Sequence, residues 1–183
     1  MEEIRTPKPH HLIYGTLKDY LTGEELTDTD DERTRQDLSR MIVEDRGYPR
    51  DTLQARLKIE TFFTHNFVTS VIDLTITLGN QLFMILRYGP GSLVSRERAA
   101  IAAARVLFPD YCVPFAVVTN GRDAELLDTR TGKILGYGLE SIPDYETGKV
   151  MLESITCFPS YKGTQKEKEL RILNAFDLER CCY

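Results

Sequence analysis

The sequence has no tryptophan, few cysteines, little net charge and no long apolar run. No stretch approaches the roughly 18–20 consecutive apolar residues that a membrane-spanning helix needs. The N-terminus begins with acidic residues and has no apolar core, so it does not resemble a signal peptide. Together these absences predict a soluble, cytoplasmic protein that is not attached to a membrane.

The few cysteines show neither a Cys-x-x-Cys pair nor the cysteine and histidine spacing of a zinc site. They are Cys112, Cys157, Cys181 and Cys182. We interpret them as reduced thiols, as expected in a cytoplasmic protein. The alternative is a metal or redox sensor in which the adjacent Cys181 and Cys182 act alone or together with His10 and His11.

The net charge of −5 argues against broad, non-specific wrapping of nucleic acid, which depends on neutralising phosphates. The charge is unevenly placed. Residues 19–37 hold eight acids and two arginines, a net charge of −6, whereas residues 84–107 hold four arginines and one glutamate, a net charge of +3. The arginines of the basic segment are candidate nucleic-acid-binding residues: Arg87, Arg96, Arg98 and Arg105. The alternatives are a solvated helix face, or a basic region that pairs with the acidic segment of the same or a second molecule.

The 183 residues fit one compact domain and are few for two. We expect a loose arm over residues 1–11, a folded core over about residues 29–135, and an extension with a terminal helix over residues 136–183. The central feature of the core is residues 68–88, two β-rich runs joined by a turn at residues 78–81. The sequence therefore predicts a β-hairpin at the centre of the sheet.

The elements on either side of this hairpin follow from periodicity and from capping residues. Before it, residues 12–25 favour a small hairpin, residues 33–46 a helix capped by Thr29 or Asp30, and residues 53–63 a half-buried strand. After it, residues 96–107 favour an alanine-rich helix capped by Ser95, and three short strands follow at residues 115–118, 124–127 and 133–135. Residues 150–152 fit a helix or a strand fragment, and residues 166–178 fit the terminal helix. This order predicts an α/β fold with a mixed central sheet flanked by helices.

One polar residue interrupts the first run of the hairpin. Asp73 stands in an otherwise apolar strand, where a carboxylate is costly to bury unless it binds a cation or accepts hydrogen bonds. We expect it to be either a ligand or a carboxylate satisfied by Arg56, by backbone N–H groups or by water. Asp73 is therefore the first candidate for a functional residue.

A series of short motifs in this order resembles the N-terminal nuclease-type domain of type I restriction enzyme R subunits, within the PD-(D/E)xK nuclease superfamily. The motifs are Glu32-Arg33-x-Arg35-Gln36, Gly47-Tyr48-Pro49, Asp73 in a β-run, a second β-run ending at Pro90, and Val118-Thr119-Asn120-Gly121. The resemblance covers about residues 29–135. It implies a restriction-endonuclease-like fold and a nuclease centre on two adjacent strands.

The active site of that family places an aspartate on one strand and Glu-x-Lys on the next. The two carboxylates hold Mg²⁺, which polarises the phosphate and activates water, and the lysine orients that water. Asp73 matches the aspartate and is thus the candidate metal ligand. The glutamate position is Leu86 and the lysine position is Tyr88. Leucine offers no oxygen ligand, and tyrosine is a protonated phenol that binds a hard cation poorly.

This departure predicts a pseudo-nuclease that has no cofactor and acts by binding nucleic acid, a protein partner or a second copy of itself. The alternative is a divergent, Mg²⁺-dependent DNA endonuclease that uses Asp73 with Glu97 or Glu60. Glu97 also has a structural interpretation, because an acid in the first turn of a helix is stabilised by the helix dipole. Glu32 is a further candidate acid.

Overall fold

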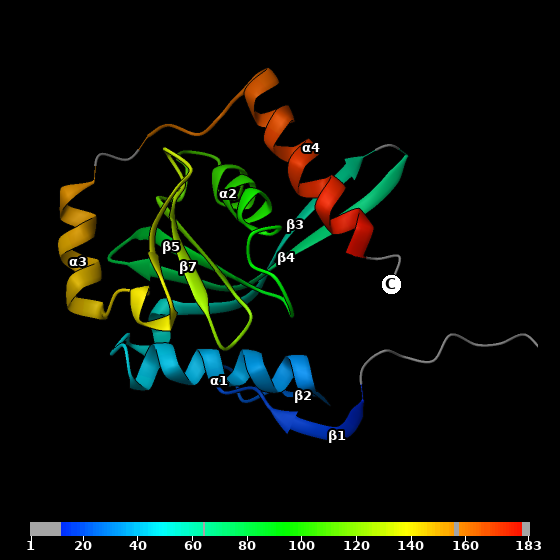
Figure 1. Cartoon of the computed structure of the whole chain (residues 1–183), viewed down its shortest axis with the longest axis vertical. Coiled ribbons are helices and arrows are strands. Elements are labelled where there is room, and N and C mark those ends of the chain that lie inside the picture. The colour runs from blue at the N-terminus through cyan, green and yellow to red at the C-terminus, as the bar shows by residue number, and fades with distance from the viewer. Residues whose placement is uncertain (1–11, 64, 156–157, 181–183) are drawn as a thin grey trace, which may run out of the picture.

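The computed structural model describes residues 12–63, 65–155 and 158–180, and its arrangement is shown in Figure 1. The helices are α1 (Asp30–Glu44), α2 (Glu97–Val106), α3 (Tyr145–Ser154) and α4 (Gly163–Arg180), with single 3-10 turns at Arg50–Thr52 and Leu139–Ser141. The strands are β1 (Ile13–Lys18), β2 (Glu25–Thr29), β3 (Leu53–Phe63), β4 (Asn66–Leu78), β5 (Gln81–Tyr88), β6 (Phe115–Thr119), β7 (Ala124–Asp128) and β8 (Lys133–Tyr137).

Six strands form one mixed sheet in the order β3-β4-β5-β6-β7-β8, and β1 and β2 form a separate antiparallel pair. Within the six-stranded sheet only β5 and β6 are parallel. Parallel neighbours need a crossover, and α2 supplies it. The predicted α/β fold with a mixed sheet flanked by helices is confirmed, and no helix in the described part of the chain is long and apolar enough to cross a membrane.

Each face of the sheet has its own hydrophobic core. On one face, Leu38 and Ile42 of α1 pack with alternate residues of the central strands, and α3 covers the same side. On the other face, α2 packs with Leu173 of α4. The alanines of α2 are all buried, which lets this helix lie close to the sheet and to α4, as the alanine-rich sequence predicted. Figure 1 shows α1 and α4 on opposite sides of the sheet.

The hairpin of β3 and β4 passes from one core to the other along its length. Ala55 pairs with Leu74 beside the first core, whereas Leu57 pairs with Ile72 in the second core. Between these two pairs lies Arg56, whose φ of +56° is unfavourable for a residue with a side chain. The apolar stripe therefore changes faces at this point, and the outer half of the hairpin, residues 57–63 and 66–72, projects beyond the body alongside α4.

Most predicted elements agree with the structure to within a few residues. Strand β3 has the predicted bounds, and α1 begins three residues before the predicted start because the Thr29 side chain accepts a hydrogen bond from the Glu32 backbone N–H at 3.1 Å. The prediction that Ser95 caps α2 is wrong, because the residue before the helix is Arg96 and no side chain caps it. Residues 150–152, left open between helix and strand, belong to α3.

Candidate functional site

Asp73 lies on β4 at the point where the hairpin changes faces, and the residue is only 8% exposed. Its Oδ1 accepts a hydrogen bond from Arg35 Nε at 2.5 Å, and its Oδ2 accepts one from the Tyr88 backbone N–H at 2.7 Å. The expectation that a backbone N–H satisfies Asp73 is confirmed. The expectation that Arg56 does so is wrong, since the arginine comes from α1.

Arg35 is held in place on several sides. Its Nη1 lies 3.6 Å from Glu32 Oε2, one helical turn earlier, and its guanidinium stands 5.2 Å from the centre of the Tyr88 ring. Burial alone would lower the pKa of Arg35, but attraction to Asp73 and Glu32 outweighs it and raises the pKa. The site therefore contains a permanent cation beside Asp73.

Arg56 belongs to the same charge network but has different partners. Its Nη2 lies 2.6 Å from Asp19 Oδ2, and its Nη1 lies 3.4 Å from Glu32 Oε1. Burial tends to raise the pKa of Asp19, yet hydrogen bonds from the Thr22 backbone and from Arg56 lower it to about 2. The alternating charges run from the β1–β2 turn to the central sheet in the order Asp19, Arg56, Glu32, Arg35 and Asp73.

The two positions that correspond to Glu-x-Lys both face the first core. Leu86 is buried between Leu74 on β4 and Val117 on β6. Tyr88 is also buried, and its hydroxyl donates a hydrogen bond to Asp31 Oδ1 at 2.9 Å. Burial, and then the contact with Asp31, raises the pKa of Tyr88. The first position thus supplies no oxygen, and the second supplies a phenol that stays protonated at neutral pH.

A cavity of about 220 Å³ opens beside Asp73. Its lining residues are Arg35, Thr69, Val71, Asp73, Arg87, Tyr88 and Asp177. Arg87 Nη2 on β5 and Asp177 Oδ1 on α4 form a buried ion pair at 2.7 Å. The sequence carries a signal for Asp177, because this residue lies four positions after Leu173, on the face that α4 turns toward the sheet. A charged residue on that apolar face indicates a buried partner.

Of the other candidate acids, Glu32 pairs with Arg35 and Arg56, and Glu97 and Glu60 lie away from this cavity. Glu97, at the first position of α2, contacts the buried Glu125 of β7, and burial followed by repulsion from Glu97 raises the pKa of Glu125. Glu60 is exposed on the outer half of the hairpin. Neither residue lines the cavity beside Asp73.

Two of the four predicted DNA-binding arginines are engaged inside the protein. Arg87 is buried against Asp177. The Nη1 of Arg105 lies 2.7 Å from Glu169 Oε1, and its Nε donates to the Thr129 carbonyl, also at 2.7 Å. These two side chains join α4 to β5 and to α2, and their first role is structural.

The other two arginines lie at the start of α2. The Arg96 guanidinium lies over Gly89 and donates hydrogen bonds to loop carbonyls, among them that of Ser92 at 3.2 Å. Arg98 is exposed. The four arginines are therefore in different environments, and only Arg98 is exposed without a hydrogen-bond partner among the described residues.

The cysteine-based sensor falls mostly outside the described residues. Cys112 is a buried free thiol, while Cys157, Cys181, Cys182 and the two histidines at 10 and 11 lie outside. Within residues 12–63, 65–155 and 158–180, no group of three or more His, Cys, Asp or Glu side chains is arranged to hold a metal ion. The sensor alternative stays a prediction.

The six-stranded mixed sheet with α1 and α3 on one face and α2 and α4 on the other agrees with a restriction-endonuclease-like fold. Residues 30–143 match the family model described as the type I restriction enzyme R protein N terminus, and the chain belongs to this family. The match begins at the first residue of α1 and extends past β8. No curated protein and no solved structure matches the chain.

Proposed function

We propose that this protein is a non-cleaving member of the family that acts by binding DNA. The observation that carries the first part is the engagement of both Asp73 oxygens, one by Arg35 at 2.5 Å and one by the Tyr88 backbone N–H at 2.7 Å. A nuclease centre of this family needs those oxygens for a metal ion. Here a guanidinium lies beside the carboxylate and donates a hydrogen bond to one of these oxygens.

The donor set around Asp73 does not fit Mg²⁺. That ion requires near-octahedral oxygen ligands, and a fixed positive charge beside the carboxylate repels it. The position that would hold the second carboxylate is occupied by Leu86, which is buried in the core and offers no oxygen.

One observation favours the alternative, a divergent metal-dependent endonuclease. Asp177 of α4 lines the same cavity as Asp73 and would place a second carboxylate there. Each of these acids, however, already has its own arginine, Arg35 or Arg87. A metal ion that bound both acids would lie against two guanidinium groups, whose positive charge repels it, although Asp177 Oδ2 has no hydrogen-bond partner of its own.

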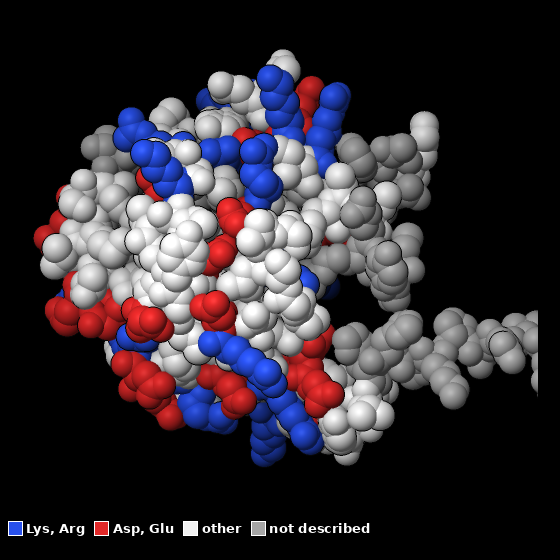
Figure 2. All heavy atoms as spheres, viewed as in Figure 1, with Lys and Arg blue, Asp and Glu red and all other residues white. Residues whose placement is uncertain are grey.

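The second part of the proposal rests on the distribution of exposed charge. Arg105 of α2 bonds both to Glu169 of α4 and to the carbonyl of Thr129, so α4 adjoins the β7–β8 turn. Figure 2 shows Lys and Arg side chains gathered over this end of the molecule, at the top of the view. We call it the basic end; its exposed members are Arg130, Lys133, Lys162, Lys166, Lys168 and Arg171. Such a surface fits a phosphate backbone.

DNA binding is tested by fluorescence anisotropy of a labelled duplex at increasing salt. The triple variant Lys133→Glu, Lys168→Glu, Arg171→Glu is expected to weaken binding and to reduce the salt slope by about 0.9 for each phosphate that is no longer neutralised. The single variant Arg40→Glu is the control, because Arg40 is an exposed residue of α1, at the opposite end of the molecule. This variant is expected to bind DNA nearly as the wild type does. Equally weakened binding in both variants, or wild-type binding that does not depend on salt, contradicts the proposal.

Cleavage is tested separately with plasmid and single-stranded DNA in Mg²⁺ or Mn²⁺. We expect no cleavage by the wild type or by Asp73→Ala. Cleavage that Asp73→Ala abolishes would establish the endonuclease alternative. If neither cleavage nor salt-sensitive DNA retention appears, a protein partner becomes the ligand to seek.

A further inference from the structure

A cavity of about 260 Å³ lies beside the β7–β8 turn and shares no lining residue with the cavity beside Asp73. Its apolar lining residues are Pro114, Phe115, Ile155 and Phe158, and its polar ones include Asp128 and Arg130. Figure 1 shows the segment between α3 and α4 passing this turn. A volume just below the roughly 300–1,000 Å³ of sites for drug-sized ligands suits a smaller ligand.

Phe158 presents a fixed aromatic ring to this cavity. Its carbonyl accepts a hydrogen bond from the Cys112 backbone N–H at 3.1 Å, and its ring centre lies 6.3 Å from that of Tyr161. The Arg105 guanidinium in turn lies 5.4 Å from the centre of the Tyr161 ring. Since Phe158 is only half-buried and lines the cavity, its ring is accessible to a ligand there.

The cavity adjoins the basic end. Arg130 both lines the cavity and belongs to the basic end, and Lys162 follows Phe158 by four residues. The Arg130 side chain is exposed and has no ion-pair partner in the described part of the chain. The acid of the lining, Asp128, is engaged by its own turn: its Oδ1 accepts a hydrogen bond from the Arg130 N–H and its Oδ2 one from the Thr131 hydroxyl, both at 2.8 Å. Exposed cations therefore lie beside an apolar cavity with an aromatic wall.

This combination fits one nucleotide of a single strand. The bases of a duplex are stacked on one another and present only their edges in the grooves, whereas an unpaired base can lie flat on an aromatic ring. We infer that the cavity holds an unpaired base of single-stranded DNA against Phe158, with the adjoining phosphates on Arg130 and Lys162. The inference rests on the proposed DNA binding and adds the form of DNA that this site takes. Because every base has an aromatic face, no particular base is selected.

The inference is tested with the full chain by fluorescence anisotropy of a labelled oligothymidylate and of the labelled duplex. Phe158→Leu keeps an apolar side chain but removes the aromatic face, and it is expected to weaken single-strand binding by about 5- to 100-fold. Duplex binding is expected to change by less than about twofold, because the protein contacts mainly its phosphates. The salt slope is expected to stay that of the wild type, since no cation is removed.

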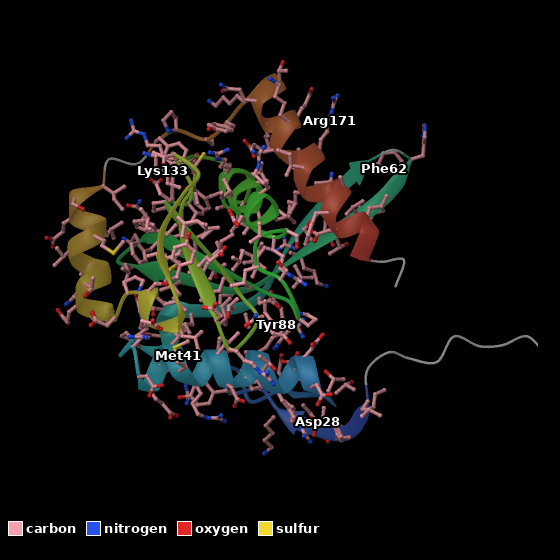
Figure 3. All side chains as sticks on the ribbon, in the orientation of Figure 1. Asp28, Met41, Phe62, Tyr88, Lys133 and Arg171 are labelled. Carbon is pink, nitrogen blue, oxygen red and sulfur yellow. The ribbon has the colours of Figure 1, made fainter. Side chains whose placement is uncertain are left out.

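Phe62→Leu is the matched control for the loss of a ring. Phe62 is 73% exposed, and Figure 3 shows it near the tip of the β3–β4 hairpin, away from Lys133 of the basic end. This variant is expected to bind both forms of DNA as the wild type does. Thermal unfolding of each variant confirms that it is folded.

The absence of tryptophan from the sequence allows an optical test that keeps an aromatic ring in the cavity. Phe158→Trp places the sole indole of the chain in the cavity wall, where a stacked base is expected to quench its fluorescence. Oligothymidylate is expected to quench Phe158→Trp, whereas the duplex is not, and neither is expected to quench Phe62→Trp. This variant also provides the test if Phe158→Leu does not fold.

Several results would overturn the inference. Single-strand affinity that Phe158→Leu leaves unchanged overturns it, and duplex binding that persists in the same experiment leaves the proposed DNA binding intact. Equal losses on the single strand and on the duplex also overturn it, as does quenching of both tryptophan variants or of neither. If neither form of DNA binds to the wild type, the proposed function and the inference fail together.

Discussion

Replacing Arg35 by methionine removes the cation beside Asp73 and keeps much of the side-chain volume. The variant leaves the Asp73 carboxylate buried with a single hydrogen bond, that from the Tyr88 backbone N–H. It also leaves Glu32 without one of its two arginine partners. We therefore expect Arg35→Met to fold with clearly reduced stability at neutral pH.

The magnitude follows from the burial of the pair. Removing one partner of a fully buried ion pair costs about 3–5 kcal/mol. The Asp73 side chain is 9% exposed, but that of Arg35 is 27% exposed, so water recovers part of the loss. We expect a decrease of about 2–3 kcal/mol in the free energy of unfolding at pH 7.

Urea denaturation of Arg35→Met, Asp73→Asn and the double variant measures the coupling directly. A coupling energy of about 2 kcal/mol is expected between the two positions. Arg40→Met is the control, because Arg40 and Asp37 form an exposed pair on the same helix and such a pair contributes less than about 1 kcal/mol. A coupling energy below about 0.5 kcal/mol would refute the central place that we give to this ion pair.

Three further predictions concern stability. The folded-state pKa of Glu125 is raised above its ordinary 4.5, so its stabilising contribution is complete below that pH and is lost as the pH rises through the folded pKa. Glu125→Gln, whose amide can donate a hydrogen bond to Glu97, should therefore be more stable than the wild type at pH 7.5 but not at pH 4. Thermal unfolding at the two pH values measures the difference. Thr29→Ala removes the cap of α1 and should cost about 1 kcal/mol in urea denaturation, and an unchanged midpoint would contradict the capping role. Gly148→Ala places a methyl group 2.6 Å from the Tyr48 hydroxyl oxygen and should cost about 1–3 kcal/mol, whereas a stability equal to that of the wild type would show that α3 can shift freely.

The sequence predicted the elements whose signals are local. The strand at residues 53–63 alternates polar and apolar residues, and the structure has it with the same bounds. The helix α1 begins where a threonine precedes three acids, a combination that satisfies the first backbone N–H groups and the helix dipole. The family resemblance also came from motifs read in order, and the family match confirms it.

The candidate site was harder to predict, because its partners are distant in sequence. Asp73 could be identified as costly to bury, but no local motif predicts that its partner is Arg35. Arg56 has a left-handed backbone and pairs with Asp19 and Glu32 instead. Asp177 reaches the cavity only because α4 packs across the sheet, far along the chain from β4. Side-chain pairing over such separations is set by tertiary packing.

The central claim, that Asp73 is not a metal ligand, is tested most directly by measuring whether it binds a divalent cation. Titration of the full chain with Mn²⁺, followed by the electron paramagnetic resonance signal of the free ion, measures this without any need for DNA. We expect the wild type and Asp73→Asn to give the same free-ion signal at every added concentration. A stoichiometric loss of free Mn²⁺ with the wild type, abolished in Asp73→Asn, would contradict it.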